Sequence, residues 1–295
     1  MTTSTTSARV IPAFVNTESG SSGAAILALQ AAGGFQVTSL PPATLTSAIQ
    51  SAVKDGAPRI LVAGGDGTIA MAASLLIGGT TELAILPGGT LNHFARDLGL
   101  TANVGQTLDL AVNGTARPID VGMVNDTVFL NTSSVGMYVR FVRMREYLEH
   151  RHAGYRIASL LAAFRILFQF RRIAVTLEVD GEERVYRTPL VFIGVGEREL
   201  KLPTLGNRVA RGRKGLHVLV VRGRTGGRAV AIGLNAIARG VGTVSRTPEL
   251  DSFIVDSCTI ERRHHGLVAV DGELVSLDQA LHYELRRGAL RVVCP

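Results

Sequence analysis

Two short apolar runs, each ending in a glycine-rich loop, constrain this chain more than any other feature. Residues 59–63 lead into the sequence GGDGT at 64–68, and residues 83–86 lead into PGGTLN at 87–92. Apolar runs of this length bounded by glycine are typical of buried strands. In an open parallel sheet the carboxyl ends of neighbouring strands meet at one edge, so the two loops should lie together. The sequence therefore predicts an α/β sheet with a ligand site at that edge.

The residues of both loops suit the phosphates of a nucleotide. Glycine lets backbone N–H groups face an anion, a carboxylate can hold Mg²⁺, and a hydroxyl can donate to a phosphate oxygen. The chain contains no G-x-x-x-x-G-K-[ST] sequence, and no G-x-G-x-x-G opens its first strand-to-helix turn, so neither common phosphate-binding loop applies. We expect a nucleoside triphosphate as the ligand. The alternative for residues 64–68 is a plain turn between a strand and a helix.

Hydrophobic periodicity predicts that strands and helices alternate in the first part of the chain. The expected strands are residues 10–15, 36–40, 60–63 and 83–86, and the expected helices are residues 23–32, 45–54, 69–77 and 92–98. This is the pattern of a parallel, three-layer domain. Beyond Gly122 the pattern changes to short runs separated by turn signals, such as residues 124–130 and 174–182, so we place a domain boundary near Gly122.

Composition is that of a globular enzyme with two modest domains: the chain has 295 residues, of which 46% are hydrophobic. Cys258 and Cys294 are the only cysteines, which gives no disulfide framework and favours a reducing, cytoplasmic location. The seven histidines form no H-E-x-x-H sequence, so a zinc site is not expected. Residues 1–8 lack the features of a secretory signal and are expected to be frayed.

Positive charge is concentrated in the second half of the chain. Residues 1–135 carry five basic and eight acidic side chains, whereas residues 140–172 carry eight Arg and residues 198–228 carry nine Arg or Lys. These stretches lack interleaved aromatic residues, so we expect no nucleic acid and favour an anionic membrane surface, the alternative being a solvated face. The apolar segment 155–170 is too short to span a bilayer and is either a buried helix or a lipid-entry element.

Four segments together carry a resemblance to a known family. The GGDGT loop and the P-x-G-T-x-N-x-x-A-R pattern of residues 87–96 resemble the diacylglycerol kinase catalytic family, which includes sphingosine kinases and bacterial lipid kinases. Residues 15–20 (VNTESG) resemble its first N-P-x-S-G loop, and residues 270–273 (VDGE) resemble an element near its end. The resemblance covers nearly the whole chain, and the two central motifs are its most specific part.

The resemblance implies both a fold and a function. The fold is an N-terminal three-layer α/β domain of residues 1–121, to which residues 280–295 return, and a C-terminal β-sandwich-like domain of residues 122–279, with an active-site cleft between them. The function is transfer of the γ-phosphate of ATP, with Mg²⁺, to a lipid hydroxyl such as that of diacylglycerol or a sphingoid base. Such an enzyme would act peripherally at the inner face of the membrane, and a homodimer is left open.

The site residues follow from the same resemblance. Asp66 would serve the metal, and Glu273 would take the proton of the acceptor hydroxyl, with Asp271 as the second choice. The tripeptide of residues 271–273 also occurs at 180–182 and suits a hairpin turn, so by itself it is not diagnostic. The predicted nucleotide-binding residues are Asn16, Thr38, Gly64, Gly65, Asp66, Gly67, Thr68, Gly89, Thr90 and Asn92.

Three departures from the family pattern leave alternatives open. Thr17 and Glu18 replace proline and a small neutral residue, and Ala70 and Met71 replace two polar residues. Lys214 stands where bacterial relatives have an aspartate that contributes to a structural Mg²⁺, and we hypothesise that its ammonium takes the place of that metal. The alternative functions are a non-catalytic lipid- or nucleotide-binding module and an NAD kinase.

Overall fold

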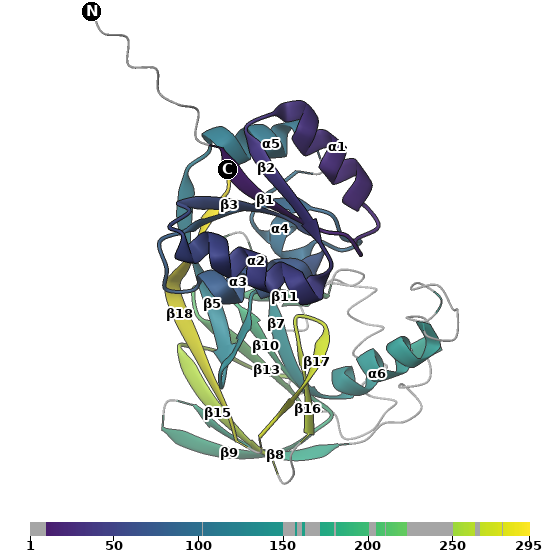
Figure 1. Cartoon of the computed structure of the whole chain (residues 1–295). Helices are drawn as coiled ribbons and strands as arrows, with labels where there is room; N and C mark the ends of the chain where they lie inside the picture. Colours follow the sequence, from purple (N-terminus) through teal and green to yellow (C-terminus); the bar gives the residue numbers. More distant parts are fainter. Residues whose placement is uncertain are drawn as a thin grey trace, which may run out of the picture. The chain divides into compact units, whose positions relative to one another are not determined.

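The computed structural model describes residues 10–101, 103–149, 157, 161–162, 172–179, 181–200, 205–209, 211–222, 250–262, 266–278 and 280–295 (Figure 1). Apart from residues 157, 161 and 162, the apolar segment 155–170 lies outside the described residues. The chain forms two compact units. Unit 1 comprises Met1–Asp120 and Arg287–Pro295, and unit 2 comprises Val121–Arg286.

A parallel sheet forms the centre of unit 1, with the strand order β2-β1-β3-β4 and the end of β18 beside β4. The strands are β1 (Ile11–Asn16), β2 (Phe35–Leu40), β3 (Arg59–Gly64), β4 (Glu82–Pro87) and β18 (Ala280–Val293). Strands β3 and β4 are apolar along almost their whole length because helices cover both faces of a parallel sheet.

Helices cover both faces of this sheet (Figure 1). On one face, α1 (Ser22–Ala32) and α5 (Val104–Asn113) contact each other and share a core with β1, β3 and β4. On the other face lie α2 (Pro42–Lys54) and α3 (Asp66–Leu76), and the short α4 (His93–Asp97) follows the loop after β4. The predicted three-layer architecture is confirmed, but the analysis of the sequence missed α5.

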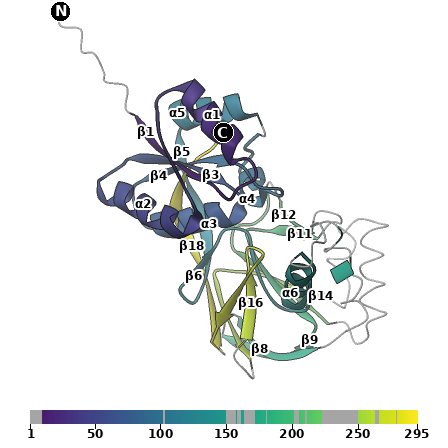
Figure 2. The ribbon, with the colours of Figure 1, turned by 45° about the vertical axis from the view of Figure 1, so that its right-hand side comes forward.

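Unit 2 is built mainly from antiparallel strands. One sheet has the order β18-β15-β8-β9 and the other β14-β13-β10-β7-β16-β17, and the two share one apolar core that includes Leu177, Ile193 and Val218. Helix α6 (Met137–Glu149) contacts β7, β16 and β17 (Figure 2). The strands are β5 (Ala116–Val124), β6 (Thr127–Phe129), β7 (Thr132–Gly136), β8 (Ile173–Val179), β9 (Glu182–Thr188), β10 (Leu190–Val195), β11 (Arg198–Leu200), β12 (Leu205–Arg208), β13 (Leu216–Val221), β14 (Leu250–Val255), β15 (Ser257–Arg262), β16 (Gly266–Val270) and β17 (Glu273–Leu277).

This α/β unit followed by a β-rich unit confirms the predicted fold class. The chain returns to unit 1 through the single long strand β18, whose first half pairs with β15 and whose residue Val292 pairs with Leu83 of β4. The predicted return at residue 280 therefore coincides with the start of this strand, while unit 1 itself resumes at Arg287. Among the described residues, no helix is long and apolar enough to cross a membrane.

Candidate nucleotide-phosphate site

Three loops of unit 1 follow neighbouring parallel strands and leave the sheet at the same edge. Residues 17–21 follow β1, residues 65–68 follow β3, and residues 88–92 follow β4. The register places Val15 beside Ala63 and Gly64 beside Pro87, so the ends of the three strands are aligned. Carboxyl-terminal edges of parallel sheets are where such folds bind ligands.

The loop after β1 is joined to the GGDGT loop through Asn16 and Thr68. Asn16 is buried, its Nδ2 donates to Thr68 Oγ1 at 2.9 Å, and its Oδ1 accepts from the backbone N–H of Glu18 at 2.9 Å. Because the hydroxyl oxygen of Thr68 accepts this bond, its proton remains to be donated to another group. The contact orients Thr68 as a hydrogen-bond donor.

Two serines tie the same first loop to the loop after β4. The hydroxyls of Ser19 and Ser21 donate to the carbonyl oxygen of Gly88 at 3.0 and 2.8 Å, and the N–H of Gly88 donates to Gly64 O at 2.8 Å. Sequence analysis did not place these serines in the site. Their place in the loop after β1 indicated this edge, but their partner Gly88 depends on a tertiary contact.

The second glycine loop is held in shape by Asn92. Its Oδ1 accepts from the N–H of Gly89 at 2.8 Å, and its Nδ2 donates to the carbonyl oxygen of the same residue at 2.7 Å. Asn92 adopts a φ of 48°, a left-handed conformation that asparagine tolerates better than most residues. A Cβ atom on Gly89 would lie 2.8 Å from Gly65 Cα, so only glycine allows the two loops to come this close.

Helix α3 points its amino terminus into the same edge. It begins at Asp66 after the N-cap Gly65, so the N–H groups of residues 66–68 have no partner within the helix and favour an anion there. The Asp66 Oδ1 accepts a long 3.4 Å bond from the N–H of Phe94. Thr90 lies exposed in the loop after β4, and Thr38 lies within β2 opposite Phe14, two residues before the end of that strand.

Asp66 is the carboxylate of the GGDGT loop that could hold a metal. Among the described residues, no three His, Cys, Asp or Glu side chains cluster as a metal site would require. Mg²⁺ commonly takes one or two protein carboxylates and completes its shell with phosphate oxygens and water, so a single aspartate beside a phosphate site fits this ion. A metal ligated only by protein side chains does not fit these described residues.

The two candidate bases lie in unit 2, with Asp271 in the tight turn between β16 and β17 and Glu273 directly after that turn. Glu273 is the exposed first residue of β17. The Asp271 carboxylate accepts three backbone N–H bonds of 2.7 to 2.9 Å from residues 130–132. Burial raises the pKa of Asp271, and the three backbone N–H donors and the charge of Arg198 oppose this shift. Of the two carboxylates, the one on Glu273 is the more open to an acceptor.

Glu182, the last residue of the repeated tripeptide, occupies a different setting. Glu182 is also the exposed first residue of a strand, β9, but its carboxylate pairs with Arg184 at 2.8 Å. The guanidinium of Arg184 also lies over the ring of Phe253. The two glutamates are therefore alike in sequence and in strand position but differ in their side-chain partners.

The loop that contains Lys214 is held by an acidic side chain. Glu197 Oε2 accepts from the N–H of Arg213 at 2.8 Å and lies 3.7 Å from its Nε, while the N–H of Gly196 donates to Gly215 O. Lys214 itself is exposed. That its ammonium replaces a metal stays a prediction.

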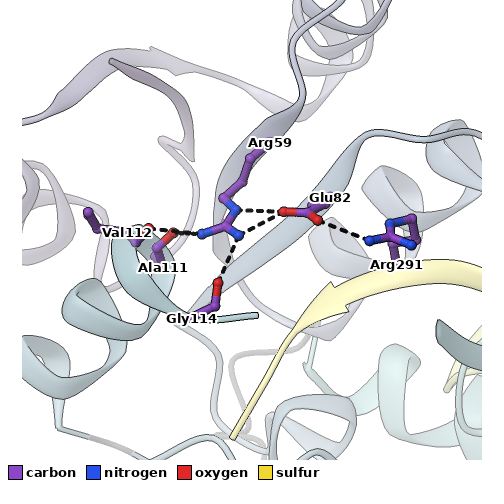
Figure 3. Close-up of polar contacts among 6 residues, drawn as sticks. All are labelled: Arg59, Glu82, Ala111, Val112, Gly114 and Arg291. Carbon is purple, nitrogen blue, oxygen red and sulfur yellow. Dashed lines mark hydrogen bonds and ion pairs between the residues drawn. The ribbon is translucent and has the colours of Figure 1, made fainter. Parts of the chain in front are cut away.

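The opposite edge of the unit 1 sheet is fixed by charged side chains (Figure 3). Arg59, the first residue of β3, donates to Glu82, the first residue of β4, from Nε at 2.9 Å and from a terminal nitrogen at 2.7 Å. Arg59 also donates to carbonyl oxygens at the end of α5, and Arg291 of β18 contacts Glu82 at 3.2 Å. This network aligns the starts of β3 and β4 with the end of the returning strand β18, and so supports the strands at the ends opposite the loops.

Comparison with known proteins agrees with this arrangement. Residues 12–124 match the family model described as the diacylglycerol kinase catalytic domain. A protein of Cronobacter sakazakii named "Probable lipid kinase YegS-like" is 40% identical over 154 residues, which is 50% of either chain. A diacylglycerol kinase of Bacillus subtilis is 32% identical over 179 residues, 58% of this chain and 55% of the relative. The matched segments thus span about half the length of these curated relatives.

The fold as a whole also has solved counterparts. A crystal structure described as a diacylglycerol kinase from Bacillus anthracis superposes with a TM-score of 0.70 at 21% identity, covering 97% of each chain. At this identity the likeness shows the fold alone. The region matched by the family model contains β1, β3 and β4 and all three loops of the candidate site. Residues 12–124, which contain the candidate site, are therefore similar to the diacylglycerol kinase catalytic domain.

Proposed function

We propose that this protein is an ATP-dependent lipid kinase that transfers the γ-phosphate to the hydroxyl of a lipid such as diacylglycerol. The proposal rests on two contacts next to the free amino terminus of α3. Asn16 joins the loop after β1 to Thr68, and Gly88 joins the loop after β4 to Gly64. Preorganised donors of this kind stabilise phosphate charge, which is most of what phosphoryl transfer requires from a protein. The names of the curated relatives support the same function.

Each predicted residue except Asp271 has a role in this proposal. The loops and the α3 terminus bind the triphosphate, Thr68 donates its hydroxyl proton to a phosphate oxygen, and Asp66 holds Mg²⁺, which neutralises phosphate charge when bound. Glu273 accepts the proton of the lipid hydroxyl as that oxygen attacks the γ-phosphorus. The nucleotide-binding residues are those predicted from the sequence, namely Asn16, Thr38, Gly64, Gly65, Asp66, Gly67, Thr68, Gly89, Thr90 and Asn92, and the structure adds Ser19 and Ser21 as residues that hold the loops together.

The proposal includes a peripheral position at the inner, cytoplasmic face of the membrane. It is supported by the excess of basic side chains after residue 139, since a lipid acceptor must be reached at a surface that is usually anionic. A homodimer stays a prediction.

Transfer of labelled γ-phosphate from Mg-ATP tests the function directly. The acceptors are vesicles that contain diacylglycerol, a sphingoid base, phosphatidylglycerol or a polyprenol, with NAD as a separate soluble acceptor and EDTA as the control for metal dependence. Label in one lipid, lost with EDTA and with Asp66→Asn, is the expected result. Label in NAD would instead identify an NAD kinase, and ATP binding without label in any acceptor would identify a non-catalytic binding module.

A further inference from the structure

Asp271 occupies the first position of the two-residue turn between β16 and β17. Asp271 has a φ of 48° and Gly272 a φ of 89°, the pair of positive values that defines the tight turn favoured by Asp-Gly. Val270 and Glu273 pair directly across this turn. The position of Glu273 therefore depends on the conformation of Asp271, a residue type that adopts positive φ only at some cost.

Four hydrogen bonds attach this turn to the segment that leads into β7. Asp271 Oδ2 accepts from the N–H of Leu130 at 2.7 Å, and Oδ1 accepts from Asn131 at 2.8 Å and Thr132 at 2.9 Å. The N–H of Asp271 donates to the carbonyl oxygen of Thr132 at 2.8 Å. Three consecutive N–H groups that converge on one carboxylate form an anion-binding concavity whose anion is a side chain of the protein itself.

These contacts decide which carboxylate can act as a base. A base needs a lone pair directed at the acceptor hydroxyl, and three of the about four lone-pair positions of the Asp271 carboxylate are already engaged by N–H donors, which favour its charged form. Glu273 is exposed, and its side chain faces no such set of donors among the hydrogen bonds of the described residues. The contacts therefore distinguish the two residues, whereas the sequence allowed either one to be the base.

We propose that Asp271 is a positioning residue: its carboxylate fixes the β16–β17 turn onto residues 130–132 and so holds Glu273 in place, without taking the proton of the lipid. This proposal rests on the proposed kinase function and adds a supporting residue to it. It also gives the Asp-Gly pair a function beyond an ordinary hairpin turn, because an ordinary turn needs no contacts with a distant segment.

Amide hydrogen exchange of the wild-type protein gives the first test, and it needs no variant. The amides of residues 130–132 should exchange at least as slowly as those in the middle of β7, although they lie just before the strand and at its first residue. Exchange as fast as in an open loop would overturn the proposal. In Asp271→Asn, an amide NH₂ replaces one acceptor oxygen, so exchange should rise about 10- to 100-fold at residues 130–132 and at 273–277.

Kinetics then distinguish positioning from proton transfer. For Asp271→Asn we expect kcat to fall about 10- to 100-fold with KM for ATP nearly unchanged, and Asp271→Ala to be more severe. The acidic limb of the pH profile should persist in Asp271→Asn, because the base is still present. The control for general destabilisation is Asp251→Asn. Asp251 lies in β14, and its carboxylate contacts Tyr186 and Arg222.

Two results would overturn the positioning role. One is loss of the acidic limb in Asp271→Asn together with its retention in Glu273→Gln, which would make Asp271 the base. The other is unchanged exchange in Asp271→Asn. If the wild-type protein labels no lipid, the kinase proposal fails, and the exchange data still decide whether Asp271 anchors the turn.

Discussion

Asn16 Nδ2 donates to Thr68 Oγ1 at 2.9 Å across 52 residues of sequence, and this bond sets the direction in which the threonine hydroxyl can donate. Asn16 ends β1 and Thr68 lies in the first turn of α3, so the bond joins the loops of two neighbouring strands. The first prediction follows from the direction of this bond, in which Asn16 is the donor and Thr68 the acceptor.

Asn16→Asp should weaken ATP binding more than Asn16→Ala does. An aspartate accepts the Thr68 proton that a phosphate would otherwise receive, and it adds negative charge, whereas alanine only removes the donor. We expect about a 10-fold higher KM for ATP in the alanine variant and a larger increase in the aspartate variant. Ser47→Ala, which removes a hydroxyl bonded to the Thr44 carbonyl on the exposed side of α2, is the matched control. Equal effects of the alanine and aspartate variants would contradict the proposal that Thr68 donates its hydroxyl proton to a phosphate.

Gly89→Ala should abolish high-affinity nucleotide binding. The new Cβ would lie 2.8 Å from Gly65 Cα and 3.0 Å from Asn92 Oδ1, so the two glycine loops would be pushed apart. Gly23→Ala in α1 is the control, because no atom lies within 4 Å of its new Cβ. Titration of both variants with a labelled ATP analogue checks this. Similar affinity in the two variants would show that the close approach of the loops does not matter.

Glu82→Gln should destabilise unit 1 by about 1 to 3 kcal/mol, because it weakens a charged network that Arg59 and Arg291 share. Burial by itself would raise the pKa of Glu82, but hydrogen bonds and charge from these arginines lower it overall. The stabilisation is therefore present above the ordinary pKa of 4.5 and is lost as the pH falls through the lowered value.

Urea unfolding at pH 7 measures this difference. Glu182→Gln removes one member of the exposed pair with Arg184 and should leave the stability almost unchanged, because solvent screens such a pair. An equal loss in the two variants would mean that the Glu82 network is no stronger than an ordinary surface ion pair.

His217 should make the stability of unit 2 depend on pH. Its Nδ1 accepts from the N–H of Arg198 and its Nε2 lies 2.9 Å from Ser252 Oγ, which assigns the proton of the neutral ring to Nε2. Burial, which outweighs the opposing charge of Glu197, lowers the pKa of His217 from 6.5 to about 4. The unfolded chain thus binds the proton first, and stability should fall by up to about 3 kcal/mol between pH 6.5 and 4.

Unfolding free energies measured across this pH range test the assignment to His217. His217→Gln should reduce the slope, and His282→Gln, which alters an exposed ring, should not. If the slope is the same in wild-type protein and His217→Gln, another group is responsible.

The sequence predicted those parts of the molecule that local pattern determines. Strands β3 and β4 are continuous apolar runs bounded by glycine, so their burial and the common edge of their loops followed from pattern alone. Helix α5 was missed even though Asn103 and Gln106 form an Asn-x-x-Gln start signal, in which Asn103 Oδ1 accepts from the N–H of Gln106 at 3.1 Å. There the start signal was present, and only its interpretation failed.

Other features could not be read from pattern because they depend on tertiary contacts. The partners of Asp271 are about 140 residues away in the sequence, and the same tripeptide occurs at 180–182. The bonds from Ser19 and Ser21 to Gly88 likewise join segments that only the folded sheet brings together. Glycine spacing indicated where a phosphate could bind, but not which side chains hold the loops in place.

The most direct measurement of the central claim is kcat for phosphoryl transfer to the accepted lipid in wild-type protein, Glu273→Gln and Glu182→Gln. Both variants replace the exposed first residue of a strand in the same tripeptide, so they match in residue type and strand position and differ in place and in side-chain partners. The account predicts a loss of about 10²- to 10⁴-fold in Glu273→Gln, with KM for ATP little changed, and normal activity in Glu182→Gln. Wild-type activity in Glu273→Gln would contradict it.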